Sequence, residues 1–215
     1  MIYGLWKDIC SHIGEKEELT STDREIYLVL AMEIIFYIMD SNSYPIEKTM
    51  KALGLNWFSL WSKIDSVLRY DVRMPTNIKV HLLGLETTII SNHLWKKESI
   101  LFSILKPEIG TKLRHTNPDY ERLSKRIIHE LVYQIYFLCK KLETPEMITN
   151  LIFQIAQYTM NEAPELCINR NLNHSVLCST YAVCKVYDLG ITFYSILSNF
   201  KDLNNLSKDA YNDIV

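Results

Sequence analysis

Hydrophobic residues recur along most of this chain at the three-and-four spacing of an amphipathic helix. The clearest case is the segment 57–70, where the apolar set is Leu60, Trp61, Ile64, Val67 and Leu68. The segment 118–142 repeats the pattern over a greater length, with Leu123, Ile127, Leu131, Ile135 and Leu138 on one side. No sustained alternation of strand type competes with these helical periods. The pattern therefore predicts an all-α fold.

The segment from Thr22 to Asp40 is apolar almost all round, which is typical of a helix that neighbours bury on several sides. It opens with Thr22-Asp23-Arg24-Glu25, which has the spacing of a capping box between Thr22 and Glu25. We therefore expect a central helix that starts at Thr22.

Further start and stop signals divide the rest of the chain into helices. Gly54 suits a left-handed residue after a helix that starts near Pro45, and Asn56 suits the N-cap of the next helix. Asn117-Pro118 and Thr144-Pro145 each combine an N-cap residue with a proline at the first helical position. The helices expected from these signals and from the apolar pattern span 45–54, 57–70, 76–95, 99–105, 118–142 and a stretch that begins near Thr144, followed by further helical pieces towards the end of the chain.

Residues 107–117 form the one polar stretch with breakers that suits a boundary between two halves. The expected organisation is a first lobe over residues 1–106, a short spacer over 107–117 and a second lobe over 118–215. We find no internal repeat of fixed period, so a solenoid is not expected.

Charge and composition exclude several classes of function. The 23 basic and 25 acidic residues give a net charge of -2 and are spread along the chain, so the basic surface of a nucleic-acid-binding protein is not expected. No apolar run reaches the length of about 20 residues that spans a bilayer, and the first residues do not form a signal peptide, so we expect an intracellular protein. The five cysteines are never spaced C-x-x-C, which argues against a disulfide framework and a zinc site.

Motifs of catalysis are absent from the sequence. It contains no phosphate-binding loop, dinucleotide-binding glycine motif, zinc-protease motif or nucleophile elbow. The six histidines have no paired spacing, and isolated histidines are more often surface or core residues than ligands or bases. We therefore expect a protein that is not an enzyme and holds no cofactor or metal.

One stretch of the second half has the features of a peptide-binding surface. The run Tyr181-Ala182-Val183-Cys184-Lys185-Val186, followed by Phe193, places polar groups inside an apolar sequence. A tyrosine hydroxyl can bond a peptide backbone, and a lysine can attract an acidic side chain.

The same stretch resembles the B box of retinoblastoma-type pocket proteins. The residues 178–186 carry the family's C-S-x-Y-x-x-C-K-V run. The flanks agree, because Phe153-Gln154 with Asn161-Glu162 and Glu165-Leu166 resembles the F-Q…N-E-x-E-L stretch. Phe200-Lys201-Asp202-Leu203 resembles the family's Y-K-D-L. In the first half, Ala31-Met32-Glu33-Ile34-Ile35 resembles the A-box helix A-L-E-V-V.

This resemblance implies two cyclin-like helical lobes that pack side by side, both shortened. It implies a nuclear, non-enzymatic transcriptional repressor that binds transcription factors of the E-two-factor and DP type and restrains entry into S phase. Contact with DNA would be indirect, through the transcription factor, and no membrane would be involved. Another cyclin-box protein, either a kinase-activating cyclin or a general initiation factor, is the alternative, and neither is expected to carry the C-S-x-Y-x-x-C-K-V run.

The resemblance also assigns site residues. Tyr181, Lys185 and Phe193 match the groove that binds L-x-C-x-E peptides of corepressors. Glu33 and Lys125 match contacts of the transactivation peptide at the lobe interface, and His129 stands where the family has an arginine.

The chain departs from the family at the L-x-C-x-E groove. Thr192 and Tyr194 replace the lysines that flank the groove phenylalanine, and the chain ends at Val215, before the family's further helix with a Tyr-Asn pair. We therefore expect weak or absent L-x-C-x-E binding and a retained site for the transactivation peptide.

Overall fold

A computed structural model of the chain describes residues 1–15, 18–40, 46–71, 74–97, 99, 101 and 118–204. The described residues form helices and no strand, so the all-α prediction is confirmed. The spacer predicted at 107–117 and nearly all of the helix predicted at 99–105 lie outside the described residues. The chain forms two compact units, Met1–Ile89 and Ile90–Val215.

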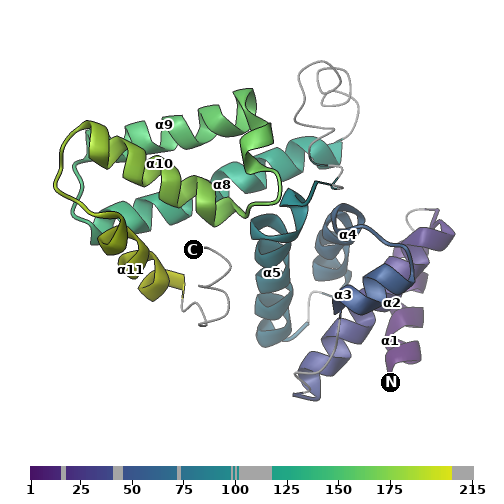
Figure 1. Ribbon diagram of the computed structural model, residues 1–215. Helices are drawn as coiled ribbons and strands as arrows, with labels where there is room; N and C mark the ends of the chain where they lie inside the picture. The colour runs from purple at the N-terminus through teal and green to yellow at the C-terminus, as the bar shows by residue number, and fades with distance from the viewer. Residues whose placement is uncertain are drawn as a thin grey trace. The chain divides into compact units, whose positions relative to one another are not determined.

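The first unit is built around α2 (Ser21–Ile38), which packs against α1 (Ile2–Gly14), α3 (Ile46–Ala52) and α4 (Trp57–Tyr70) (Figure 1). Tyr27, Val29, Leu30 and Ala31 of α2 are fully buried. The prediction of a buried central helix in this segment is therefore confirmed. A fifth helix, α5 (Thr76–Ser91), follows in the chain.

The start of α2 differs from the prediction. The capping box joins Thr20 and Asp23 rather than Thr22 and Glu25: the Asp23 amide donates to the Thr20 hydroxyl at 3.1 Å, and the Thr20 amide donates to the Asp23 carboxylate at 3.1 Å. Lys63 of α4 holds the same carboxylate at 2.8 Å. Although burial raises the pKa of Asp23, the hydrogen bonds from Lys63 and Thr20 outweigh it and hold that pKa below its ordinary value. Asp23 therefore caps α2 and ties it to α4.

Two other helix boundaries also differ from the prediction. The helix predicted over 76–95 ends at Ser91 and is followed by a short 3-10 turn, η1 (His93–Trp95). Thr144 does not cap the following helix, α9 (Glu146–Glu162), because its hydroxyl donates to the Cys139 carbonyl at 2.9 Å and closes the preceding helix instead. By contrast, Gly54 has the expected positive φ of 65°, and Asn56 caps α4 by accepting from the Ser59 amide.

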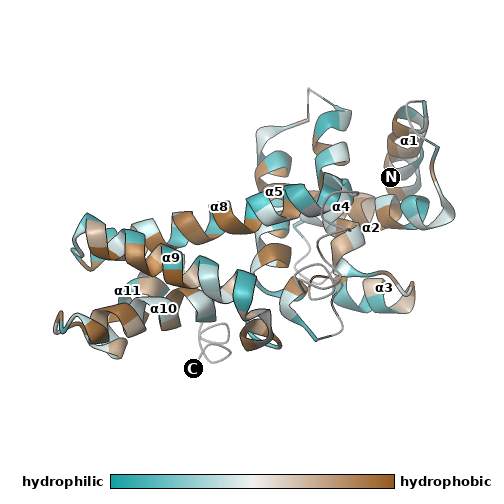
Figure 2. Ribbon diagram, turned by 90° about the horizontal axis from the view of Figure 1, so that it is seen from above, coloured by the Kyte–Doolittle hydropathy of each residue, from teal (hydrophilic) through white to brown (hydrophobic). Residues whose placement is uncertain are grey.

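The second unit contains α8 (Pro118–Lys141), α9, the 3-10 turn η2 (Pro164–Cys167), α10 (Leu172–Val186) and α11 (Phe193–Asn204) (Figure 1). The central helix is α10, which contacts α8, α9 and α11. Along α8, hydrophobic and hydrophilic residues occupy different sides of the helix (Figure 2), and the five residues predicted for its inner face are all buried. This packing fixes which side of α8 and of α10 faces outward.

The α1 helix was not predicted, although its apolar positions carry the signal. Leu5, Ile9 and Ile13 follow a four-residue spacing, and Ile9 is fully buried against the rest of the unit. None of the described helices is long and apolar enough to cross a membrane.

The capping box of α2 gives a test of the fold. Thr20→Ala removes the hydroxyl that accepts from Asp23, so we expect the free energy of unfolding to fall by about 1 kcal/mol. Urea denaturation followed by circular dichroism measures this change. Thr22→Ala is the matched control and should change stability by only a few tenths of a kcal/mol. A larger loss in Thr22→Ala than in Thr20→Ala would contradict this assignment.

Candidate functional site

Two of the three residues predicted for the L-x-C-x-E groove lie in direct contact. Tyr181 on α10 and Phe193 at the start of α11 meet edge to face, with ring centroids 5.4 Å apart and an angle of 78° between the rings. Tyr181 is 37% exposed and Phe193 is 38% exposed. The pair therefore forms an aromatic surface that is exposed to solvent. We call these two residues the aromatic step.

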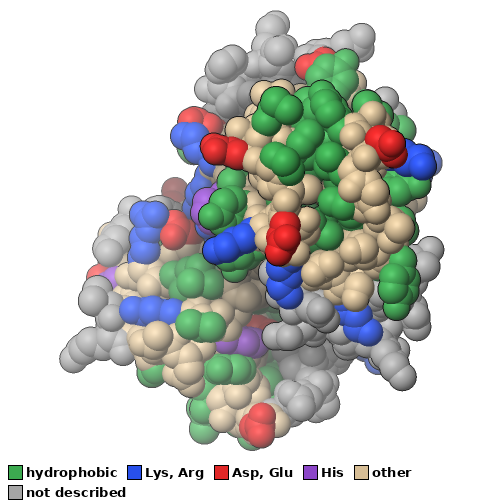
Figure 3. All heavy atoms as spheres, turned by 90° about the vertical axis from the view of Figure 1, so that its left-hand side faces the viewer, with side chains coloured by type: hydrophobic (Ala, Val, Ile, Leu, Met, Phe, Trp, Pro, Cys, Tyr) green, Lys and Arg blue, Asp and Glu red, His purple; other side chains and the backbone are tan. Residues whose placement is uncertain are grey.

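Lys185 follows Tyr181 by one helical turn on α10 and is exposed. Its ammonium group therefore borders the aromatic step on the same side of the helix. Further apolar side chains lie at the end of α10 and the start of α11, since Val186, Tyr187 and Tyr194 are all exposed. On the side seen in Figure 3, hydrophobic side chains gather on the second unit, with charged side chains scattered around them.

The C-S-x-Y-x-x-C-K-V run thus divides between core and surface. Cys184 is buried, and burial raises the pKa of its thiol. Ser179 and Val183 are also buried, whereas Cys178, Tyr181 and Lys185 face outward. The outward residues are the ones that a partner can reach.

Glu33, predicted at the transactivation-peptide site, lies on α2 in the first unit. Its carboxylate is 2.9 Å from the His81 imidazole of α5. The His81 ring stacks on Tyr37, with centroids 4.0 Å apart and an angle of 12° between the planes. Only 15% of the Glu33 side chain is exposed, so this carboxylate is held in one position.

Lys125 and His129 lie on α8 in the second unit, one turn apart, and both are exposed. Lys125 forms an ion pair with Glu121 at 2.6 Å, but the two side chains are 73% and 66% exposed. Exposed pairs within one helix contribute little to stability, so a carboxylate from a partner can replace Glu121 at low cost.

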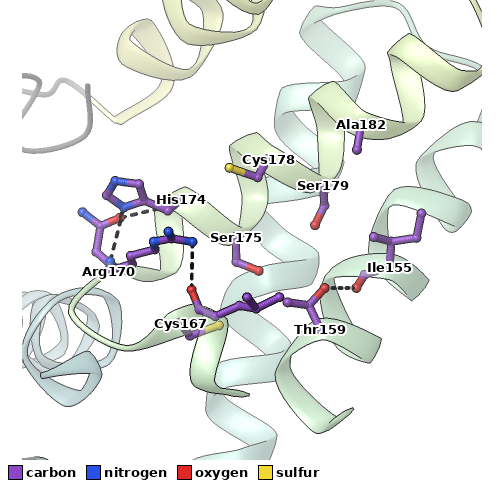
Figure 4. Close-up of a pocket in the computed structure, with 11 residues that line it drawn as sticks. Ile155, Thr159, Cys167, Arg170, His174, Ser175, Cys178, Ser179 and Ala182 are labelled. Carbon is purple, nitrogen blue, oxygen red and sulfur yellow. Dashed lines mark hydrogen bonds between the residues drawn. The ribbon is translucent and has the colours of Figure 1, made fainter. Parts of the chain in front are cut away.

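A cavity between α9 and α10 was not predicted from the sequence. It has a volume of about 230 Å³, and its walls include Ile155 and Thr159 of α9 and Ser175, Cys178 and Ala182 of α10. In Figure 4 the hydroxyls of Ser175 and Ser179 point into this space in front of Thr159. The Ser175 hydroxyl is buried and has no hydrogen-bond partner among the described residues. The cavity is therefore lined by both apolar and polar side chains, and one of its hydroxyls is not satisfied by a described residue.

Arg170 and His174 border this cavity near the start of α10. His174 belongs to the capping box of α10 with Asn171. Burial, and then the nearby Arg170, lower the pKa of the His174 imidazole, so this ring is neutral at pH 7. The guanidinium of Arg170 donates to the Leu166 carbonyl at 3.0 Å. Among the described residues, no group of three His, Cys, Asp or Glu side chains could hold a metal ion.

Two family models match the chain in the expected order. The model described as Retinoblastoma-associated protein A domain matches residues 23–105, and the model described as Retinoblastoma-associated protein B domain matches residues 120–215. Together they account for most of the chain, and the second contains the aromatic step and the exposed side of α8.

Curated relatives agree with these matches. Retinoblastoma-like protein A of Dictyostelium discoideum is 21% identical over 230 residues, which cover 86% of this chain and 17% of the relative. Retinoblastoma-related protein of Cocos nucifera is 28% identical over 76 residues, which cover 35% of this chain and 8% of the relative. Retinoblastoma-related protein 2 of Oryza sativa subsp. japonica is 30% identical over 76 residues, which also cover 35% of this chain and 8% of the relative. The chain thus spans less than a fifth of the length of these relatives.

The division of the C-S-x-Y-x-x-C-K-V run predicts a difference in thiol reactivity. Cys178 is exposed, whereas burial raises the pKa of both Cys139 and Cys184 and shields their sulfur atoms. We expect iodoacetamide at neutral pH to label Cys178 first in the folded protein, as measured by peptide mass mapping over time. Cys178→Ser should remove the fast phase, and fast labelling of Cys184 would show that α10 does not have this orientation.

Proposed function

Because this chain belongs to the retinoblastoma-type pocket proteins, we propose that it is a non-enzymatic nuclear adaptor that represses transcription and restrains entry into S phase. Its partners on this proposal are transcription factors of the E-two-factor and DP type, and it reaches DNA only through them. The observation that carries the proposal is that the A and B domains are both retained, in order, with Lys125 exposed on α8.

The proposed transactivation-peptide site uses Glu33, Lys125 and His129. Lys125 would pair with an acidic residue of the peptide, since its present partner Glu121 is exposed and easily displaced. His129 would donate a hydrogen bond in place of the family's arginine. Glu33 would accept from a peptide amide, and its contact with His81 supports this role because it fixes the carboxylate before binding.

The L-x-C-x-E groove is the second proposed site, with a smaller role. Tyr181 would form a hydrogen bond with the peptide backbone, Phe193 beside it would form an apolar wall, and Lys185 would attract the glutamate of the peptide. Thr192 and Tyr194 lack the positive charges that the family places beside the phenylalanine. The electrostatic attraction for an acidic peptide is therefore reduced on this proposal.

Charge reversal at Lys125 tests the first site. We expect a synthetic transactivation peptide of an E-two-factor protein to bind the wild-type chain and to bind Lys125→Glu at least about tenfold more weakly, as measured by isothermal titration calorimetry. The loss follows because the variant places like charges together. Lys48→Glu changes an exposed lysine of α3 and is the matched control. Equal heats for wild type and Lys125→Glu, or no heat for either, would end this proposal.

Binding of an L-x-C-x-E peptide tests the second site. We expect a dissociation constant above about 10 μM, or no detectable binding, in a fluorescence anisotropy titration. The double variant Thr192→Lys, Tyr194→Lys restores the family's positive charges and should tighten binding by about threefold or more. Tight binding by the wild-type chain would show the prediction to be wrong.

A further inference from the structure

The outward side of α8 is unusually apolar beyond Lys125 and His129. Val132 is 45% exposed, and Tyr133 and Tyr136 are each 54% exposed. With the partly exposed Phe137, these residues form what we call the α8 aromatic face. They follow one another at helical spacing, so they make one continuous surface about two turns long. A contiguous exposed apolar patch of this kind marks an interaction surface more often than scattered apolar residues do.

The rings of the α8 aromatic face support one another. The Phe137 centroid is 4.6 Å from that of Tyr133 and 5.4 Å from that of Tyr136, the second contact being edge to face at 86°. Phe137 therefore lies between the two tyrosines and limits their rotation. An aromatic surface that is already ordered loses little side-chain entropy on binding, and tyrosines are frequent anchors of interfaces.

The other elements of the second unit leave this face open, because they pack on the opposite side of α8. The buried residues of α8 lie on that inner side, which α9, α10 and α11 contact. The exposed tyrosine rings of this face are thus not part of the buried core. Their presence therefore calls for a reason outside the fold of this unit.

The charges beside the face indicate the chemistry of its partner. Lys140 and Lys141 follow it by one turn, are exposed, and have no ion-pair partner among the described residues. His129 precedes it by one turn. The surface is therefore apolar with two lysines at its C-terminal end, which complements a segment that combines apolar and acidic residues.

The same charges argue against a parallel pairing of this face with that of a second copy of this chain. A two-fold interface brings equivalent surfaces together. A parallel pairing of two α8 helices would place Lys140 opposite Lys140. This arrangement brings like charges together, and the nearby Glu130 carboxylate already accepts a hydrogen bond from Gln134 of its own helix at 3.0 Å.

We propose that the α8 aromatic face binds an acidic amphipathic helix from a partner protein. Apolar residues of that helix at positions i, i+3, i+4 and i+7 pack on Tyr133 and Tyr136, and its carboxylates pair with Lys140 and Lys141. The surface from His129 to Lys140 is about 16 Å long, which matches about three turns of the partner helix. This contact requires neither Glu33 nor Lys125 and is separate from the proposed transactivation-peptide site.

A designed peptide provides the probe. It is a fluorescein-labelled helix of about 18 residues with Leu and Phe at i, i+3, i+4 and i+7 and Glu at the other positions. Fluorescence anisotropy should show saturable binding to the wild-type chain and at least about tenfold weaker binding of a scrambled peptide with the same composition. Binding should weaken with salt. No binding, or equal binding of the scrambled peptide, would overturn the proposal.

Variants locate the contact. Tyr133→Ser, Tyr136→Ser should bind the probe at least about tenfold more weakly, with unchanged circular dichroism. Met147→Ser, Tyr158→Ser is the matched control, because it removes two exposed apolar side chains of α9, and it should change the affinity less than about twofold. Lys140→Glu, Lys141→Glu should weaken binding and reduce its salt dependence. Equal losses in the two apolar double variants would overturn the proposal.

Three further measurements distinguish binding of an acidic helix from binding at the transactivation-peptide site, from self-association and from base stacking. Lys125→Glu should bind the designed peptide with at least about a third of the wild-type affinity, so a failure of the transactivation-peptide proposal leaves this one testable. Sedimentation velocity should show the same monomer for wild type and Tyr133→Ser, Tyr136→Ser. A dimer that the tyrosine variant abolishes, or oligo(dT) binding that it abolishes, would overturn the proposal in favour of self-association or of base stacking.

Discussion

The burial of one side of α10 against α8, α9 and α11 determines what the second unit can present to a partner. Residues three and four apart on a helix point the same way, so fixing the inner residues also fixes the outer ones. On α10, Thr180 and Cys184 point inward and Tyr181 and Lys185 point outward. The most characteristic run of the sequence therefore serves two purposes at once, since some of its residues hold the fold and the others form the recognition surface.

The same constraint applies to α8, whose apolar stripe is longer than that of α4. Its inner side is fully occupied by packing, and this orients Lys125, Tyr133 and Lys140 towards solvent without any further contact. An amphipathic helix of this length provides a rigid support on which surface residues can vary independently of the core. Basic and aromatic groups can then succeed one another along the outer side while the helix keeps its position.

The sequence was most informative where one physical signal dominated. The amphipathic stripe of 57–70 and the side chain of Asn56 defined both ends of α4. The start of α2 was misplaced because two threonines with acidic residues three positions later lie close together, and only the contact of Asp23 with Lys63 distinguishes them. The contact of Tyr181 with Phe193 was accessible through a family resemblance, whereas the α9–α10 cavity depends on how two separate helices pack and could not be read from either alone.

Asn169 links the second unit to a segment from the first half of the chain. It adopts a left-handed backbone with φ of 56°, its amide donates to the Trp95 carbonyl at 2.8 Å, and its side-chain oxygen accepts from the Lys97 amide at 3.0 Å. The A-domain match extends over Trp95, yet by packing this residue belongs to the second unit. The border of the domain match and the border of the packed units thus differ. A second unit that begins at residue 118 would lack the partners of Asn169, whereas one that begins at Ile90 would retain Trp95 and Lys97.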